Sequence, residues 1–258
     1  MIDEPFRWVE AIANRREYIE NELITGSPTV GLTMPEGQLL LTFGRDRRKI
    51  FEIYDRIAMG AIGHPGDIER LRMTAIELAS TEGFTRSAAD VSLRRMANYS
   101  FSPALKQAFE QIYGPPYLAR VLFVEVGETP ESDLFIRLDY DGTMTASNMG
   151  IGSKRETFGV IAGTKRAAQQ VENFLRAQPL PEALEAALDL AVRAWGIGRY
   201  CADEDHQELP DDETLHAFLG EQLVSYTAEA VLLERKARIT FVPILPDNLE
   251  KVIGRYRP

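Results

Sequence analysis

The residues whose types could support catalysis or metal binding are few and widely spaced. His64, His206 and His216 are the only histidines, and no two of them have the spacing of metal ligands on one helix. Residues 203–206 combine three acidic side chains with a histidine and could hold a cation loosely, but acidic loops are usually just solvated. Cys201 has no neighbour positioned by sequence to lower its pKa, and no GxSxG nucleophile motif occurs. No metal site is therefore predicted, and no cofactor.

The amino-acid composition limits the classes of partner that the protein could bind. The chain has 258 residues, with 39 Asp and Glu against 29 Lys and Arg, and a formal net charge of -10. Because nucleic acids and anionic membranes are bound largely through cations, this balance and the lack of a dense basic block argue against both partners. No apolar run approaches the ~20 residues that span a bilayer. A single cysteine excludes an internal disulfide, and we expect a cytoplasmic protein.

The first part of the sequence predicts one helix followed by two pairs of strands. A helix is predicted over residues 5–25, ended by Gly26. Short apolar runs at residues 29–33 and 38–43 flank a Met-Pro-Glu-Gly turn and predict a hairpin. Residues 49–54 and 56–62 predict a second strand pair.

The rest of the chain alternates runs of helices with runs of strands. Helices are predicted at residues 67–83, at 87–113 with a kink or break at Pro103, at 164–177 and at 181–195. Strands are predicted at residues 117–126, 134–140, 158–162, 224–233 and 239–244, and residues 203–213 are the best candidate for a mobile loop. Such an order favours an α+β fold with two antiparallel sheets between helix layers over a doubly wound parallel sheet.

Three segments together carry a resemblance to a known family. Residues 27–31 (Ser-Pro-Thr-Val-Gly), 48–55 (Arg-Lys-Ile-Phe-Glu-Ile-Tyr-Asp) and 58–63 resemble the opening strands of proteasome subunits, most closely the α-type subunit of actinobacterial-like proteasomes. The likeness covers about residues 6–195. It implies the four-layer αββα sandwich shared with N-terminal-nucleophile hydrolases. We expect an N-terminal helix over residues 1–26 and a single proteasome-like domain over residues 27–258.

Matching these segments to proteasome subunits position by position (the family register) allows the two proteasome subunit types to be distinguished. A catalytic β-type subunit needs an exposed N-terminal threonine whose α-amino group acts as base, with a lysine and an aspartate beside it. The resemblance places Ser27 at the nucleophile position, Lys49 at the lysine position and Phe43 at the aspartate position; a shifted hairpin would substitute Asp46. Ser27 is followed by Pro28 and preceded by a predicted helix. We therefore expect a non-catalytic α-type subunit, the alternative being a hydrolase that acts through Ser27 and Lys49 after cleavage between residues 26 and 27.

An α-type subunit implies particular partners. The resemblance implies a ring of identical subunits, expected to be a heptamer, that gates substrate entry and stacks on a ring of proteasome β-type subunits. It also implies docking of an ATPase activator ring, whose terminal carboxylate would meet Lys49 in a pocket where Gly63 allows close backbone approach. A solvated lysine and an ordinary turn glycine are the simpler alternatives.

The N-terminal helix is expected to assemble the ring through Phe6, Trp8, Ile12 and Ile19, although apolar helix residues usually pack on their own domain. The Tyr-Asp-Arg gate motif of archaeal and eukaryotic α subunits is absent before this helix. A third alternative is a ring-forming scaffold without a protease partner.

Overall fold

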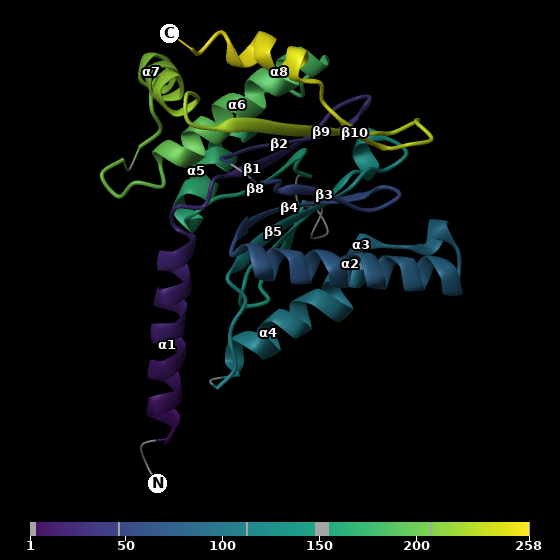
Figure 1. Ribbon diagram of the computed structural model, residues 1–258, viewed down its shortest axis with the longest axis vertical. Helices are drawn as coiled ribbons and strands as arrows, with labels where there is room; N and C mark the ends of the chain where they lie inside the picture. Colours follow the sequence, from purple (N-terminus) through teal and green to yellow (C-terminus); the bar gives the residue numbers. More distant parts are fainter. Residues whose placement is uncertain (1–3, 46, 112, 148–154, 207, 258) are drawn as a thin grey trace.

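In the computed structural model two five-stranded antiparallel sheets lie face to face between layers of helices (Figure 1). The structure describes the chain except residues 1–3, 46, 112, 148–154, 207 and 258. The α+β sandwich expected from the order of elements is confirmed.

The first sheet has the order β10-β9-β2-β1-β8. Its strands are β1 (Thr29–Thr33), β2 (Gly37–Gly44), β8 (Phe158–Ile161), β9 (Thr227–Glu234) and β10 (Phe241–Pro243). The predicted hairpin forms between β1 and β2, where Met34 and Gly37 exchange backbone hydrogen bonds. Strand β2 then pairs with β9, which lies nearly two hundred residues later in the chain.

The second sheet has the order β3-β4-β5-β6-β7. Its strands are β3 (Ile50–Tyr54), β4 (Ile57–Gly63), β5 (Ala119–Glu125), β6 (Leu134–Leu138) and β7 (Met144–Ala146). Consecutive strands pair throughout, so this sheet is a meander of local connections. The second predicted strand pair is β3 with β4.

Helices cover the outer face of each sheet. Apolar residues of α2 (Pro65–Thr85), α3 (Leu93–Met96) and α4 (Ser102–Glu110) share one buried cluster with the second sheet. Those of α5 (Lys165–Arg176), α6 (Leu184–Tyr200), α7 (Asp212–Gln222) and α8 (Pro246–Ile253) pack on the first sheet. A separate apolar cluster joins the two inner faces, with Leu40, Leu122 and Phe135 among its members. These three clusters are the contacts between four successive layers.

Several elements differ from the sequence prediction. The helix expected over residues 87–113 is shorter and irregular. It begins at Leu93, after a separate 3-10 turn at Ala88–Asp90, and runs without a gap through α3, a π-helical stretch at Ala97–Phe101 and α4 to Glu110. The π-helical stretch interrupts the regular α-helix directly before Ser102 and Pro103, and the helix continues through Pro103 without a break. The expected loop over residues 203–213 overlaps the start of α7, and α7, α8 and β7 were not predicted.

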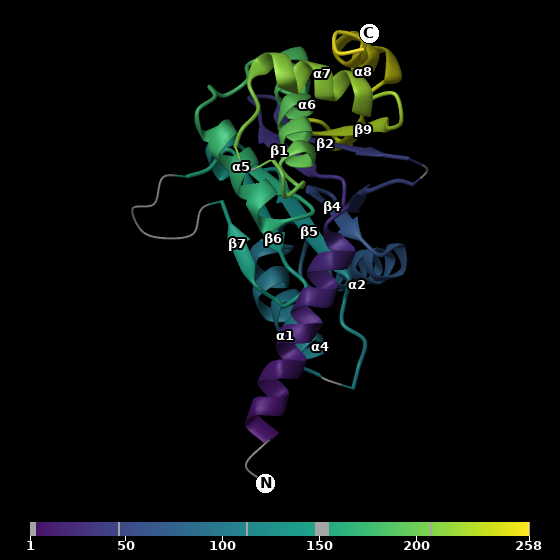
Figure 2. The same ribbon diagram turned by 90° about the vertical axis from the view of Figure 1, so that its left-hand side faces the viewer.

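Helix α1 (Glu4–Leu23) lies at one edge of the sandwich, and its N-terminal turns extend past the body of the molecule (Figures 1 and 2). Its last turns pack between α4 and the turn after β6, through Ile19, Leu23, Phe109 and Tyr140. Of the helices in the described part of the chain, none combines the length and the apolar character that crossing a bilayer requires.

Candidate functional site

Ser27, the residue at the nucleophile position, is held by two hydrogen bonds inside the fold. Its Oγ donates to the carbonyl oxygen of Phe43 at 2.6 Å and accepts from Nε1 of Trp195 at 2.9 Å. The residue is 9% exposed. A hydroxyl has one proton to give, and here it goes to a backbone carbonyl instead of a base. In the uncleaved chain the backbone nitrogen of Ser27 is an amide that continues into Gly26 and helix α1, so there it offers no α-amino base.

Phe43, at the position where the resemblance calls for an aspartate, belongs to the apolar core. It is fully buried on β2, and its ring centroid lies 4.4 Å from that of Trp195. Position 43 therefore supplies no carboxylate, and Asp46, the substitute that a shifted hairpin would provide, lies outside the described residues. The contact between Phe43 and Trp195 could not be read from the sequence, since the two residues lie on β2 and α6.

Lys49, the residue at the lysine position, lies beside Ser27. Its Nζ donates to the carbonyl oxygen of Ser27 at 2.8 Å and approaches Oγ1 of Thr42 at 3.4 Å. The carboxylate of Glu229 on β9 accepts hydrogen bonds from the backbone nitrogens of Lys49 and Ile50. Burial lowers the pKa of Lys49 to about 7, with Glu229 opposing and Arg199 reinforcing the shift. Burial also raises the pKa of Glu229, although its hydrogen bonds favour the charged form.

Gly63 and Lys49 line the same surface hollow of about 440 Å³, between the β2–β3 loop and the start of α2. The structure thus brings together the two residues proposed for activator docking. Gly63 also has a purely structural reason to be glycine. Its φ is +128°, and a Cβ there would lie 2.0 Å from the carbonyl oxygen of Leu118.

The expected ring-assembly residues divide into two groups. Ile19 is fully buried against its own chain and Ile12 packs partly on the same cluster, so the expectation that Ile19 contacts a neighbouring copy is corrected. Trp8 lies on the same helical face, one turn beyond Ile12, and is 45% exposed. The side chain of Phe6 lies outside what the structure describes.

An ionic cluster that sequence reasoning missed fixes the base of α1. Arg120 on β5 bonds Glu20 of α1 at 2.5 Å, Asp139 at 3.1 Å and the carbonyl oxygen of Gly163 at 2.6 Å. Burial alone would raise the pKa of Glu20, but its hydrogen bonds from Arg120 and Tyr140 outweigh burial and lower it. The signal in the sequence was an arginine directly before the apolar run at residues 121–124 of β5.

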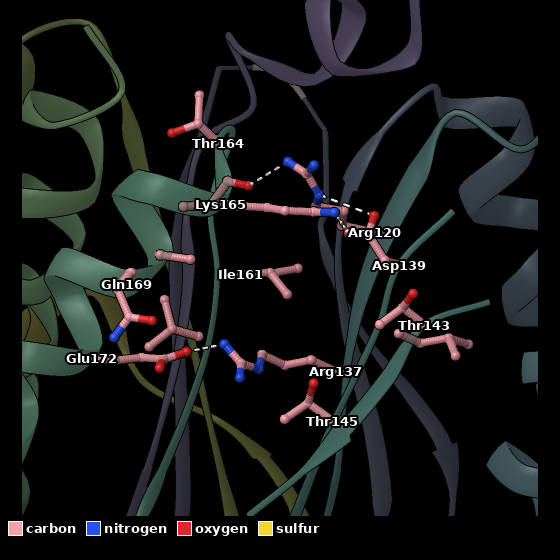
Figure 3. Close-up of a pocket in the computed structure, with 14 residues that line it drawn as sticks. Arg120, Arg137, Asp139, Thr143, Thr145, Ile161, Thr164, Lys165, Gln169 and Glu172 are labelled. Atoms are coloured by element: carbon pink, nitrogen blue, oxygen red, sulfur yellow. Dashed lines mark hydrogen bonds and ion pairs between the residues drawn. The ribbon is translucent and has the colours of Figure 1, made fainter. Parts of the chain in front are cut away.

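The ionic cluster also forms one wall of a cavity of about 280 Å³ between β5, β6, β8 and α5 (Figure 3). Lys165 extends from α5 toward Asp139, with Nζ 3.6 Å from Oδ2, and Arg137 points at Glu172 on the opposite wall. Three cations (Arg120, Arg137 and Lys165) and two carboxylates (Asp139 and Glu172) line the cavity. Glu20, outside this lining, supplies a third carboxylate, 2.5 Å from Arg120 and 3.8 Å from Nζ of Lys165, so each cation of the cavity has an acidic partner.

The remaining candidates from the sequence do not assemble into a site. No group of three or more His, Cys, Asp or Glu side chains within the described ranges lies close enough to share a metal ion. His206 stacks on Tyr200 at 3.8 Å, and burial raises the pKa of the Cys201 thiol. A raised thiol pKa makes a poorer nucleophile at neutral pH.

Comparisons with known proteins show the family of the chain. Residues 25–176 match the model of a family described as proteasome subunit. The chain is 30% identical over 189 residues to a protein named proteasome subunit alpha from Acidothermus cellulolyticus, covering 72% of this chain and 77% of the relative. A protein of the same name from Actinosynnema mirum is 30% identical over 216 residues, which are 83% of this chain and 77% of the relative. A third, from Streptomyces avermitilis, is 34% identical over 137 residues, or 52% of this chain and 54% of the relative.

Proposed function

The chain belongs to the proteasome subunit family, and from that premise we propose that it forms the outer ring of a proteasome-like protease. It is an α-type, non-catalytic subunit, as its relatives' names and the engaged hydroxyl of Ser27 both support. In the proposed assembly the ring controls substrate entry, stacks on a β-type ring that carries the threonine nucleophiles, and docks an ATPase activator. The whole particle works in the cytoplasm.

The apolar face of α1 is the observation that carries ring formation. Leu23, Ile19 and Ile12 lie on one face of the helix and contact the body of their own chain. Trp8 continues this face past the edge of the body, where it is 45% exposed. An aromatic side chain on an unsupported helix end is a typical anchor for a neighbouring subunit. Repeating a head-to-tail contact closes a ring when the rotation per subunit allows it.

Activator docking rests on the hollow that holds Lys49 and Gly63. Gly63 is exposed at this hollow, so its backbone is open to an incoming chain. Lys49 lines the same hollow directly before β3, 22 residues after Ser27. A terminal carboxylate entering the hollow would gain a charge-assisted hydrogen bond from the lysine ammonium. Met1, Ile2 and Asp3 lie outside the described residues, so gating is proposed for the ring as a whole and not for those residues.

Native mass spectrometry tests the proposal on the full chain, alone and mixed with a β-type subunit from the same genome. We expect full-length subunits in a ring, or in a mixed particle, with the denatured mass of the complete chain. Trp8→Ala should shift the ring to smaller species, whereas Leu180→Ala, which removes an apolar side chain exposed to a similar extent (40%), should leave it intact. A monomer that begins at Ser27 would instead establish the hydrolase alternative. A ring that never joins the β subunit would establish the scaffold alternative.

A further inference from the structure

The hollow that contains Lys49 carries more positive charge than a single lysine. Arg45, Arg47 and Arg48 form the β2–β3 side of its wall, and all three are exposed. We call these residues the arginine rim. The rim lies on a chain whose net charge is -10, so it is a local exception to an acidic protein. Like charges are kept together on a surface at an electrostatic cost, and an anionic partner removes that cost.

The described carboxylates of the same chain leave most of this charge available. Asp46, which lies between Arg45 and Arg47 in the sequence, is outside the described residues. Among the described residues, none of the carboxylates lies within ion-pair distance of Arg45 or Arg47. Arg48 approaches Glu229 only at 3.7 Å, and its side chain is 71% exposed. Glu229 is already engaged by the backbone nitrogens at the start of β3.

Among the residues that the structure describes, the one carboxylate that lines the hollow is also engaged. Glu69 on α2 accepts two hydrogen bonds from Arg72, at 2.8 and 2.7 Å. The guanidinium of Arg72 in turn lies 5.6 Å from the ring centroid of Phe51, which lines the same hollow. This pair is close to neutral as a unit, so it does not cancel the arginine rim.

The rim has a defined position. The guanidinium of Arg45 lies 5.0 Å from the ring centroid of Tyr226, a cation–π contact that anchors one end of the loop. Phe51, Pro65 and Ile68 line the hollow beside the rim with apolar surface. An extended peptide entering here would meet apolar side chains in the hollow and guanidinium groups at its edge.

We infer that the arginine rim selects docking tails that carry acidic side chains shortly before their terminal carboxylate. This inference rests on the proposed docking at Lys49 and adds a specificity to it. The terminal carboxylate goes to the lysine side of the hollow, and the acidic side chains preceding it pair with Arg47 and Arg48 at the rim. Guanidinium groups suit this task because each can bind a carboxylate through two parallel N–H donors.

The strength of the preference follows from the exposure of the rim. An exposed ion pair contributes about 0.2–1 kcal/mol, so two pairs should favour an acidic tail by about five-fold in low salt. Because the screening length shrinks to about 3 Å at 1 M salt, the preference should disappear there.

The test compares two synthetic peptides of equal length with a free carboxyl end, one with two glutamates before the end and one with two glutamines. Binding to the assembled protein is measured by fluorescence anisotropy. The wild type should prefer the acidic peptide, and the double variant Arg47→Gln/Arg48→Gln should bind both peptides as the wild type binds the glutamine peptide. The matched control Lys236→Gln/Arg238→Gln removes the same charge from another exposed turn and should keep the preference.

The outcomes separate this inference from the docking proposal. If the wild type binds both peptides equally and Lys49→Met abolishes binding, docking stands and the rim has no selective role. If neither peptide binds at any salt concentration, both are overturned. If the rim variant shifts the native mass from ring to smaller species, the hollow is a contact between copies of this chain, and the inference is wrong.

Discussion

Replacing Lys49 with methionine tests whether its ammonium is held partly uncharged near neutral pH. Burial lowers the pKa of Lys49 to about 7 in the folded chain, while an unfolded lysine keeps a pKa near about 10.4. Between these values the unfolded state binds more protons than the folded state, so the free energy of unfolding rises with pH. The cost of charging Lys49 is fully present below about pH 7. It is released as the pH rises toward the unfolded value.

The structure sets the size of the effect. One pKa unit corresponds to about 1.4 kcal/mol. A completely buried lysine would therefore raise the free energy of unfolding by up to about 2 kcal/mol between pH 7 and 8.5. The side chain of Lys49 is only half-buried, and water at the hollow screens part of the shift. We therefore expect the free energy of unfolding of the wild type to rise by about 1 kcal/mol relative to that of Lys49→Met between pH 7 and 8.5. Loss of the hydrogen bond to Ser27 adds an offset that does not change with pH.

Urea unfolding followed by tryptophan fluorescence measures the difference between wild type and variant from pH 6.5 to 8.5. Protein concentration is held constant, because assembly would otherwise change the apparent stability. Lys236→Met, at an exposed site on the β9–β10 turn, controls for the loss of a charge. A difference between wild type and Lys49→Met that stays constant over the whole range would refute the reasoning, since Lys49 would then be charged throughout.

Three further predictions concern groups that hold the fold around the site. Arg120→Met removes the buried cation of two half-buried carboxylates, which keep only the exposed Lys165, and should lower the free energy of unfolding by about 3 kcal/mol; adding Glu20→Gln should recover part of the loss, and recovery of nothing would show that Glu20 is not its partner. Gly63→Ala should cost about 1–3 kcal/mol because of the positive φ, whereas Gly66→Ala, in the first turn of α2, should be nearly neutral in the same thermal melt. Ser27→Ala should cost about 1–3 kcal/mol through an unpaired indole N–H and leave the intact mass unchanged apart from the missing oxygen; a wild type shorter than the variant would reveal self-cleavage.

Local patterns predicted the parts of the fold that are built locally. The β1–β2 and β3–β4 hairpins follow from turn residues between short apolar runs, and both are confirmed. Helix α7 was missed although its signal is local: Asp211 caps it by accepting from the backbone nitrogen of Thr214 at 2.8 Å. The acidic residues at its start belong to the stretch 203–213, for which a mobile loop is predicted, whereas acidic side chains also favour the N-terminus of a helix. The pairing of β2 with β9 has no local signal, because the two strands are far apart in the chain.

In the candidate site, too, the sequence predicted some features and not others. The positions of Ser27 and Lys49 follow from the family register, but the partners that define their chemistry do not. Trp195 reaches Ser27 from α6, and Glu229 reaches Lys49 from β9. The cluster of Arg120 with Glu20 joins α1 to β5, a contact between residues one hundred positions apart. Each of these contacts depends on the packing of complete layers, which no local pattern specifies.

Structural interactions engage the described positions that would form a catalytic centre, Ser27, Phe43 and Lys49. The hydroxyl of Ser27 is bound to Phe43 and Trp195, and the ammonium of Lys49 is bound to the carbonyl of Ser27. A tail that docks at Lys49 must therefore compete with an existing hydrogen bond, and the exposed guanidinium groups of Arg47 and Arg48 meet the anion first. Rim charges act mainly on association rates, and buried charges act mainly on dissociation. We accordingly expect Arg47→Gln/Arg48→Gln to slow binding in a salt-dependent way and Lys49→Met to speed release, a separation that stopped-flow fluorescence can measure. Identical kinetic defects in the two variants would contradict this division of roles.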